Sequence, residues 1–565
     1  MNKNYTAISG GFRTVTLACI SMLFSAFSQH LLASQQSQTL VLIGGTLTTC
    51  SSMSPKNCNN KGVPKGKSAS NFQITEANIK QVDAQWPSKN TAHKAKILNL
   101  LSKMANQHTQ TLSKKRLLWA WRDTNNQLLN QLSDAEYHFV LDMLEVPVLD
   151  AQGRRIKEQV ATHHNAEPAS VDILNFIKAS ASVATKSPSL LAVTASSRDP
   201  YESADFYEGL LSQTGIQATW LPLTPALAKA ITSGQCKALG ELRTQVMQAY
   251  NREAIYTDRV KAEQQLCEQG VAHLVKLIAS ATGIMFNGGD QSLTKQVLFD
   301  DEGKPYPWTQ TIKERPLLIG TSAGTAVQSG SKNQFGQVAM ITNGTSVAAM
   351  EQGVHAVAAP SARCIQDCQQ GLSGDALTYQ ADGGLGSFNF GILDTHFSER
   401  NRSVRLATLL AHTGQRFGFG VDETTALVVI RSAQGEVMTV VGKHGVVHIK
   451  SISPQSFSYS YWPSGTFVDV GQDGFSIHQR TLAKALTDIN IPALPEQRFA
   501  GILEDAKLRS LTQAMCLAKQ QQAQAKHEKF NFAFLADDST RYLRVNKTKF
   551  GCAIESLKIS YSNNH

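Results

Sequence analysis

The residues with the clearest chemical meaning surround Ser322, in the sequence GTSAG that runs from Gly320 to Gly324. A short apolar run precedes this motif, and small residues that suit a helix follow it. A G-x-S-x-G motif between a strand and a helix is typical of a nucleophile elbow, because the flanking glycines allow the sharp turn that exposes the serine hydroxyl. An ordinary turn rich in serine and glycine is the alternative, since the short motif alone is not specific.

A serine hydroxyl is a weak nucleophile near neutral pH, so it needs a base within hydrogen-bond reach and a third group that orients this base. One apolar run downstream ends close to His396, and another is followed by Glu423. Because open α/β sheets present functional residues at the carboxyl ends of their strands, we predict that His396 is the base and Glu423 the orienting acid. Taken singly, His396 also fits a structural histidine and Glu423 a surface carboxylate.

The order of these residues along the chain is Ser322, His396, Glu423. The α/β-hydrolases place their acid before their histidine, so this order argues against an esterase or a lipase of that fold. A class I glutamine amidotransferase would carry cysteine in the elbow, where this chain has Ser322.

Several segments, in the same order along the chain, resemble those of the cyanophycinases, which are serine exopeptidases of the peptidase E group. These segments are QTLVLIGGT from Gln38, FNGGDQ from Phe286, GTSAG around Ser322, DTHFSERNRSVRL from Asp394 and GVDETTALVV from Gly420. The resemblance covers roughly Gln38 to Thr48 and Ser170 to Lys450. It implies that Ser322 is the nucleophile, His396 the general base and Glu423 the third member of a triad.

The resemblance also implies a substrate pocket near the predicted base. The residues that match the pocket of the family are Gln291, Asp394, Arg400, Arg402 and Arg405. Cyanophycinases usually carry glutamine immediately before the histidine, whereas this chain has Thr395. Because threonine is shorter, we expect a change in fine substrate preference but not in the hydrolytic chemistry.

The reaction implied is hydrolysis of cyanophycin, a polyaspartate backbone with arginine joined to each β-carboxyl group by an isopeptide bond, to β-aspartyl-arginine dipeptides. Ser322 would attack the carbonyl carbon, His396 would take and return the proton, and water would resolve the acyl-enzyme. Backbone N–H groups of Ala323 and of Gly289, in the Gly288-Gly289 turn, would hold the oxyanion. A simple turn at the end of a strand is the alternative for the two glycines.

The residue types near His396 suit such a substrate. The three arginines that follow it supply forked donors for substrate carboxylates, and Asp394 or Asp290 suits a guanidinium group. A solvated helix face is the alternative for Arg402 and Arg405, because they are three residues apart with Glu399 close by.

Composition narrows the class of protein further. The 565 residues can bury a large core with additions, and the hydrophobic content of 42% is ordinary. The formal net charge of +10 raises the question of nucleic acid, but lysine and arginine are scattered and no common nucleic-acid-binding module is present. We find no metal motif, P-loop or dinucleotide fingerprint, so no cofactor is implied. The expected partner is cyanophycin or another aspartyl peptide, not nucleic acid, and a homodimer is left open.

The N-terminal residues 1–34 have the pattern of a signal peptide. Lys3 and Arg13 precede an apolar stretch from Val15 to Phe27, and small residues after it offer cleavage sites. This stretch is shorter than the roughly 20 apolar residues of a membrane anchor. We therefore predict a secreted or periplasmic protein that has no membrane contact once the leader is removed.

Cysteine content agrees with export. Of the 9 cysteines, Cys19 lies in the leader, and the even number that remains suggests disulfide bonds. We predict pairing of nearest neighbours, because each pair then falls within one segment: Cys50 with Cys58, Cys236 with Cys267, Cys364 with Cys368, and Cys516 with Cys552. Half of a metal site is the alternative for Cys364 and Cys368, although no second Cys/His cluster supports it.

Helical and strand-like patterns alternate from Ser170 to Gln291, which predicts a parallel sheet with right-handed crossovers. The resemblance implies an α/β fold of the flavodoxin-like or class I glutamine amidotransferase-like type, a three-layer sandwich around a mostly parallel sheet. We also expect hairpin strands over 437–449 and a polar helix over 510–529. The predicted parts are a catalytic domain over 35–50 and 169–462, a helical insertion over 51–168 and a C-terminal extension over 463–565.

The interpretation that these observations favour is an exported serine exopeptidase of cyanophycinase type. A relative that acts on other aspartyl dipeptides or isopeptides is the second interpretation. A catalytically inactive protein that binds arginine-rich or acidic polymers is the third, and the presence of all the predicted catalytic residues argues against it.

Overall fold

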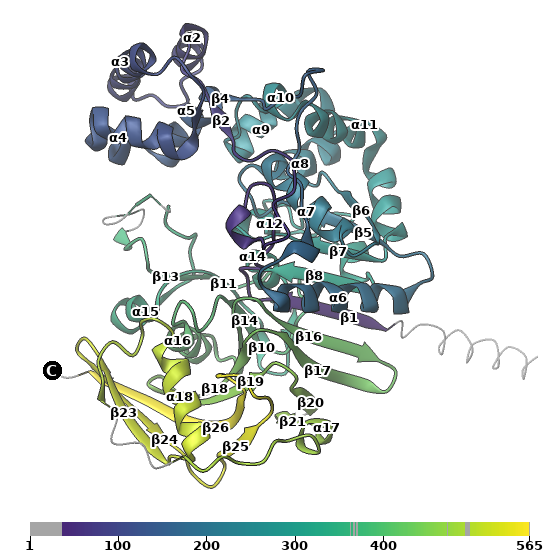
Figure 1. Ribbon diagram of the computed structural model, residues 1–565, viewed down its shortest axis with the longest axis vertical. Helices are drawn as coiled ribbons and strands as arrows, with labels where there is room; N and C mark the ends of the chain where they lie inside the picture. The colour runs from purple at the N-terminus through teal and green to yellow at the C-terminus, as the bar shows by residue number, and fades with distance from the viewer. Residues whose placement is uncertain are drawn as a thin grey trace, which may run out of the picture.

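The computed structural model describes residues 37–361, 363–364, 368, 371–471, 473–491 and 498–563. The predicted signal peptide lies outside the described residues. The chain is a mixed α/β protein with two nine-stranded sheets. Figure 1 shows the parallel strands of the first sheet with their helices in the middle of the molecule and most of the second sheet below them.

The first sheet combines a parallel half with an antiparallel half. Its parallel strands are β1 (Gln38–Ile43), β5 (Ser189–Val193), β6 (Gln217–Trp220), β7 (Gly283–Phe286) and β8 (Leu317–Thr321). Its antiparallel strands are β16 (Thr425–Ser432), β17 (Gly435–Gly442), β20 (Phe467–Gly471) and β21 (Gly474–Ile477). The order across the sheet is β21-β20-β17-β16-β1-β8-β7-β5-β6.

Helices cover both faces of the parallel half. Leu40 and Leu42 of β1 lie in one core cluster with side chains of helix α11 (Thr257–Ser280). Val41, between them, lies in another cluster with side chains of α6 (Pro168–Ala184). Successive side chains of a strand point to opposite faces, so an apolar strand such as β1 must be covered on both. The predicted alternation of helices and parallel strands is confirmed.

The second sheet lies in the C-terminal half of the chain and is largely antiparallel, apart from the parallel pairs β14–β15 and β22–β23. Its strands are β14 (Ile392–Thr395), β15 (Phe417–Val421), β18 (Gly445–Ser453), β19 (Ser456–Pro463), β22 (Arg498–Phe499), β23 (Gln522–His527), β24 (Phe530–Leu535), β25 (Arg541–Arg544) and β26 (Cys552–Asn563). Helices α16 (Ser403–Thr413) and α18 (Lys507–Ala518) pack in its core. The prediction of one mostly parallel sheet is therefore incomplete.

Two predicted elements of this half differ from the structure. The strands expected to form one hairpin over 437–449 are β17 and β18, which belong to different sheets and pair with β16 and β19 instead. The polar helix expected over 510–529 ends at Ala518, and Gln522–His527 is strand β23. Ala523 and Ala525 alternate with exposed glutamines on β23, and this period of two favours a strand over a helix.

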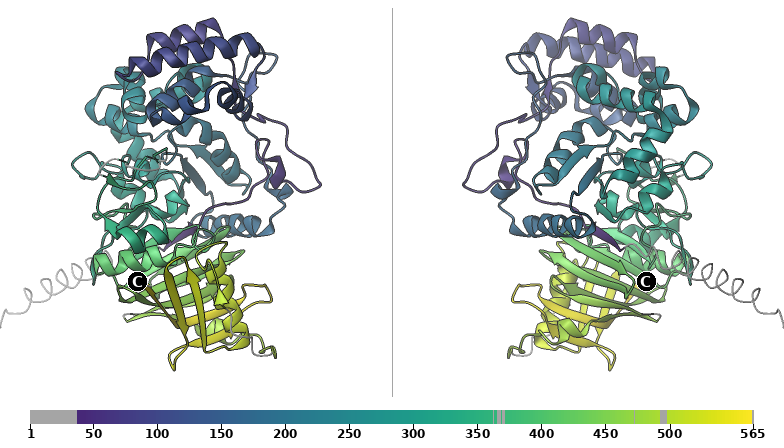
Figure 2. Two further views of the ribbon diagram at one scale, coloured as in Figure 1. Left: turned by 90° about the vertical axis from the view of Figure 1, so that its left-hand side faces the viewer. Right: turned by 90° about the vertical axis from the view of Figure 1, so that its right-hand side faces the viewer.

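Residues 76–144 form four helices around a core of their own, which includes Trp121 and Phe139. They are α2 (Glu76–Ala84), α3 (Thr91–Gln107), α4 (Lys114–Gln131) and α5 (Asp134–Leu144). Figure 2 shows these helices at the end of the molecule opposite the second sheet.

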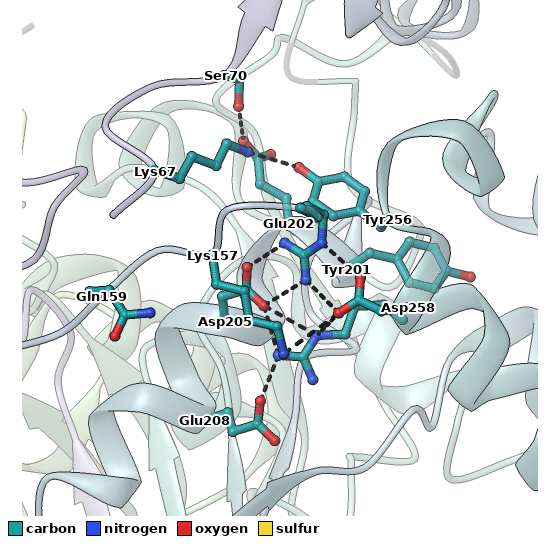
Figure 3. Close-up of polar contacts among 12 residues, drawn as sticks. Lys67, Ser70, Lys157, Gln159, Tyr201, Glu202, Asp205, Glu208, Tyr256 and Asp258 are labelled. Atoms are coloured by element: carbon teal, nitrogen blue, oxygen red, sulfur yellow. Dashed lines mark hydrogen bonds and ion pairs between the residues drawn. The ribbon is translucent and has the colours of Figure 1, made fainter. Parts of the chain in front are cut away.

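Ion pairs on one side of this helical group and a buried hydrogen bond on the other attach the flanking segments to the α/β part (Figure 3). Arg155 donates to Asp205 of α7 (Pro200–Ser212) at 2.5 Å and to Asp258 of α11 at 2.7 Å. Lys67 donates to the Tyr256 hydroxyl at 3.2 Å. Because each buried charge has a partner, these contacts avoid the large cost of an unpaired charge and define where the segments sit.

The four disulfide bonds have the predicted pairing: Cys50–Cys58, Cys236–Cys267, Cys364–Cys368 and Cys516–Cys552. The bond between Cys364 and Cys368 uses the two thiols that the alternative metal site would need. Within the described part of the chain, no helix is long and apolar enough to cross a membrane.

Candidate active site

The turn at Ser322 joins strand β8 directly to helix α14 (Ala323–Ala326), as the motif predicts. Ser322 itself has a backbone φ angle of 53°, a conformation that residues other than glycine rarely adopt. Neither glycine of the motif could be replaced, because there is no room for a Cβ atom at either position. A Cβ on Gly320 would lie 2.1 Å from the carbonyl oxygen of Gly324, and one on Gly324 would lie 2.2 Å from that of Phe286.

Ser322, His396 and Glu423 are hydrogen-bonded in series. The Ser322 hydroxyl lies 2.7 Å from Nε2 of His396, and Nδ1 of His396 lies 2.7 Å from Oε1 of Glu423. Ser322 follows a strand of the first sheet, whereas the other two residues follow β14 and β15 of the second. The three side chains therefore meet at the junction of two sheets and not along the edge of one.

The surroundings set the charges that general-base chemistry requires. Burial lowers the pKa of His396, and its hydrogen bond to Glu423 opposes this only in part. The nearby Arg400 and Arg402 lower the same pKa further. The hydrogen bond to His396 holds the pKa of Glu423 below its ordinary value. Near neutral pH the imidazole is thus a free base and the glutamate is ionised, as in a hydrolytic triad.

The glycine turn after β1 supports the histidine, a role that the sequence did not reveal. The backbone N–H of His396 donates to the carbonyl oxygen of Gly44 at 2.7 Å. Gly45 has a φ of 115°, and a Cβ at this position would lie 2.3 Å from Cε1 of His396. The only signal in the sequence is the GGT turn itself, because the contact joins residues that are far apart in the chain.

Two backbone N–H groups near the serine have no acceptor among the described residues, and they belong to Ala323 and Gly289. Both residues line the cavity in front of Ser322. The neighbouring Gly288 N–H is different, because it donates to the Tyr207 hydroxyl at 3.2 Å. Gly289 has a φ of 143°, and a Cβ there would lie 2.1 Å from the carbonyl oxygen of Ser196, so only glycine fits.

A cavity of about 880 Å³ opens above Ser322 and His396. Arg400 lines this cavity, and so do Tyr137 and His138 of helix α5. No group of three or more His, Cys, Asp or Glu side chains suited to a metal ion occurs in the part of the chain that the structure describes.

Asp394 and Arg405 line this cavity but are bound to each other. Asp394 is only 1% exposed, and Arg405 donates to its carboxylate through Nε at 2.8 Å and through Nη2 at 2.5 Å. Although burial alone would raise the pKa of Asp394, Arg405 and Arg402 hold it below its ordinary value. The fork of Arg405 is thus engaged within the protein.

Arg402 is also largely enclosed, and it donates to the carbonyl oxygen of Thr395 at 2.7 Å. Burial and the neighbouring Arg405 lower the pKa of Arg402 to about 9, so its guanidinium group remains charged near neutral pH. The alternative of a solvated helix face for Arg402 and Arg405 is therefore wrong.

The other predicted pocket residues differ in how free they are. Arg400 is exposed, and its guanidinium group forms no ion pair or hydrogen bond with any described residue. Thr395 is buried and lines the cavity. The amide nitrogen of Gln291 donates to the carbonyl oxygen of Ile341 at 2.6 Å. Asp290 caps helix α12 (Gln291–Lys295) by accepting from a backbone N–H, and it lines the cavity as well.

The fold and the site together define a mixed α/β protein with a serine, a histidine and a glutamate in hydrogen-bonded series at the mouth of a cavity. No family model matches the chain. The cyanophycinase of Geminocystis herdmanii is 30% identical over 183 residues, which cover 32% of this chain and 53% of that protein. The one of Synechococcus elongatus is 27% identical over 216 residues, covering 38% and 52%. The one of a Nostoc species is 24% identical over 265 residues, covering 45% and 71%.

These similarities relate the chain to the cyanophycinases. It spans about half the length of the first two of these curated relatives. The solved structure of a peptidase from an acI-B1 actinobacterium is similar to the chain at 17% identity with a TM-score of 0.32, over 54% of this chain and 92% of that one.

Proposed function

We propose that the protein is a serine peptidase of cyanophycinase type, with Ser322 as nucleophile, His396 as general base and Glu423 as the acid that orients it. The observation that carries this proposal is the pair of 2.7 Å contacts that links the three side chains. Such an arrangement lets the imidazole accept the serine proton while the carboxylate stabilises the resulting imidazolium.

The reaction begins when Ser322 Oγ adds to the substrate carbonyl and its proton passes to His396 Nε2. The oxyanion that forms accepts hydrogen bonds from the N–H groups of Ala323 and Gly289, which have no other acceptor within the described chain. His396 returns the proton to the leaving amine, and an acyl-enzyme remains. Water then adds with the same base, and Ser322 is released.

The substrate class follows from the charges that stay free at the cavity. Arg400 lies beside the histidine and can hold a substrate carboxylate with its forked donors. Asp290 keeps its carboxylate at the cavity and suits a guanidinium group. Cyanophycin carries both groups on each repeat, so we propose its hydrolysis to β-aspartyl-arginine dipeptides. Arg402, Arg405, Asp394 and Gln291 shape the pocket around these groups.

A related activity on other aspartyl dipeptides or isopeptides is the second candidate. It rests on Thr395, which lines the cavity where the relatives' pattern has glutamine. Thr395→Gln should shift the ratio of turnover on cyanophycin to that on aspartyl dipeptides. An unchanged ratio would show that position 395 does not select the substrate.

The test of the main proposal is incubation of the mature protein with purified cyanophycin, followed by mass spectrometry of the products. β-Aspartyl-arginine should appear with the parent protein and not with Ser322→Ala. A fluorophosphonate probe should label the parent at Ser322. Turnover that persists in a clean Ser322→Ala preparation would sink the assignment of the nucleophile.

We also propose that the parts of the chain have separate tasks. The flavodoxin-like catalytic domain over 35–50 and 169–462 supplies the chemistry, and the helical insertion over 51–168 limits access to it. Support for the second point comes from Tyr137 and His138 of α5, which line the cavity. The disulfide bonds support an exported protein, either secreted or periplasmic.

A further inference from the structure

Helix α18, from the C-terminal part of the chain, places a buried arginine next to the segments that carry His396 and Glu423. Arg509 is 5% exposed, and its Nη1 donates to Oε1 of Glu399 at 2.5 Å and to Oδ2 of Asp422 at 2.8 Å. Its guanidinium group also lies over the ring of Phe550, 4.5 Å from the centroid. The segments that resemble cyanophycinases end before α18, so this contact is an addition to the predicted site.

The two carboxylates that bind Arg509 hold the backbone that carries the base and the acid. Oε2 of Glu399 accepts from the N–H of Glu423 at 3.1 Å. Oδ1 of Asp422 accepts from the N–H of Ser398 at 3.0 Å, two residues after the base. One cation therefore links both segments of the His396–Glu423 pair.

These segments contain strained backbone. His396 has a φ of 47°, and Thr424, next to the acid, has a φ of 54°. Such conformations are unfavourable and persist only where the surrounding contacts enforce them. The hydrogen bonds from Glu399 and Asp422 are contacts of this kind.

Two carboxylates, Glu399 and Asp422, share the single guanidinium group of Arg509. Glu399 faces Asp422 and Arg509, and His444 Nε2 lies 3.9 Å from its Oε1. The Tyr461 hydroxyl, on β19, donates to Asp422 at 3.3 Å. Burial, followed by Arg509, lowers the pKa of His444 to about 4, so this histidine is neutral near pH 7. Arg509 is thus the charged partner of both carboxylates.

We propose that Arg509 is a positioning residue for the triad, which makes the C-terminal part of the chain necessary for an active base. The inference rests on the proposed function, because it assigns a role relative to His396 and Glu423. Arg509 touches neither of these side chains. It acts through the backbone contacts of Glu399 and Asp422.

Loss of Arg509 should have a specific dependence on pH. Burial and the nearby Asp422 raise the pKa of Glu399 to about 7, and Arg509 counteracts this rise. Without Arg509 the pKa of Glu399 rises further, so at low pH Glu399 is protonated and adds no charge beside Asp422. As the pH rises through this raised pKa, a negative charge develops on Glu399 next to Asp422 without a cation, and the repulsion displaces the Glu423 segment.

The experiment measures the rate at which a fluorophosphonate probe labels Ser322 between pH 5 and pH 9, approximately the range that spans the pKa values of histidine and of a raised carboxyl group. This readout does not depend on the identity of the substrate. Arg509→Met should lose about tenfold or more in rate on the alkaline side and clearly less on the acid side, the scale expected when a general base is misplaced. Arg509→Lys should stay within about threefold of the parent, because a single nitrogen, Nη1, makes both contacts.

Two further variants separate positioning from a plain loss of stability. Arg509→Met combined with Glu399→Gln removes the excess charge and should restore a flat alkaline profile. Arg541→Met, at the exposed first residue of strand β25 in the same part, is the matched control and should label like the parent. Should Arg509→Met not fold, Arg509→Gln keeps a hydrogen-bonding side chain without the charge and should show the same alkaline loss.

The inference is overturned if folded Arg509→Met labels with the rate and pH profile of the parent. It is also overturned if the loss is equal at every pH and Glu399→Gln does not relieve it, because Arg509 would then serve folding alone. Failure of the proposed function is distinguishable, since the parent itself would then show no labelling at Ser322.

Discussion

The buried pair of Asp394 and Arg405 offers the sharpest test of which arginines serve the fold and which meet the substrate. Arg405→Met would leave the Asp394 carboxylate, which is 1% exposed, with the Thr395 backbone N–H at 2.7 Å and, as a charged partner, Arg402 at the longer distance of 3.4 Å. Removing one partner of a buried ion pair costs about 3–5 kcal/mol, because the other charge remains buried. Asp394→Asn together with Arg405→Met leaves no uncompensated carboxylate and should cost less than either single change.

The expected loss in the free energy of unfolding can be converted into a shift of the melting temperature. At about 2.1 cal/mol/K of unfolding entropy per residue, 1 kcal/mol corresponds to about 1.5 °C in a domain of about 300 residues, so Arg405→Met should lower the thermal midpoint by roughly 5–8 °C. The pH gives an independent check. Because the pKa of Asp394 is lowered in the folded state, the stability from this pair is present above the ordinary carboxyl pKa and is lost as the pH falls through the lowered value.

The matched comparison is Arg400→Met. Arg400 is exposed and forms no ion pair with a described residue, so its removal should change the free energy of unfolding by no more than about 0.5 kcal/mol. Its effect should appear in kcat/KM on cyanophycin, with a loss of about 1.5–3 kcal/mol if it binds a substrate carboxylate. The reasoning is refuted if Arg405→Met melts within about 2 °C of the parent while its KM rises as much as that of Arg400→Met.

Three further predictions concern the support of the triad. Gly45→Ala places a Cβ 2.3 Å from the His396 ring, so labelling of Ser322 should fall by about 100-fold or more, and an unchanged labelling rate would show that the turn can yield. The labelling rate of the parent should rise with pH through a midpoint below the ordinary histidine pKa of about 6.5, because burial lowers the pKa of His396. A midpoint above that value would contradict the assignment of His396 as the base. Replacing both Cys516 and Cys552, which are 36 residues apart, by serine should destabilise the C-terminal part by about 4 kcal/mol in the loop-entropy model, and urea unfolding followed by proteolysis near α18 would measure it.

The parallel half of the first sheet was predictable because most of its strands are apolar runs that alternate with helices. The second sheet was not, because its pairings join distant residues. Strand β19 pairs with β26, for example, with Ser456 opposite Ser560. Short alternating strands such as β23 leave only a weak period-two signal, and no local feature says which partner they take.

At the site, too, the feature set by the local sequence was predictable, and the features set by contacts between distant residues were not. The elbow motif made Ser322 recognisable, since the demand for two glycines is local to the turn. The roles of Gly45 and Arg509 were not recognisable, because they depend on how the strands and α18 pack. Arg509 and Glu399, for instance, are 110 residues apart in the chain.

The site is assembled from residues that follow strands of two different sheets. The proposed nucleophile follows a strand of the first sheet, and the proposed base and acid follow strands of the second, so the 2.7 Å contact between Ser322 and His396 exists only when the sheets are correctly joined. The chain crosses between the sheets just after Glu423, where β15 ends and β16 begins. Gly45 contacts the base from the first sheet, and Arg509 holds the crossing from the second. The position of the proposed triad therefore depends on the junction of the two sheets, and changes at either support should misplace His396 even though Ser322, His396 and Glu423 are all present.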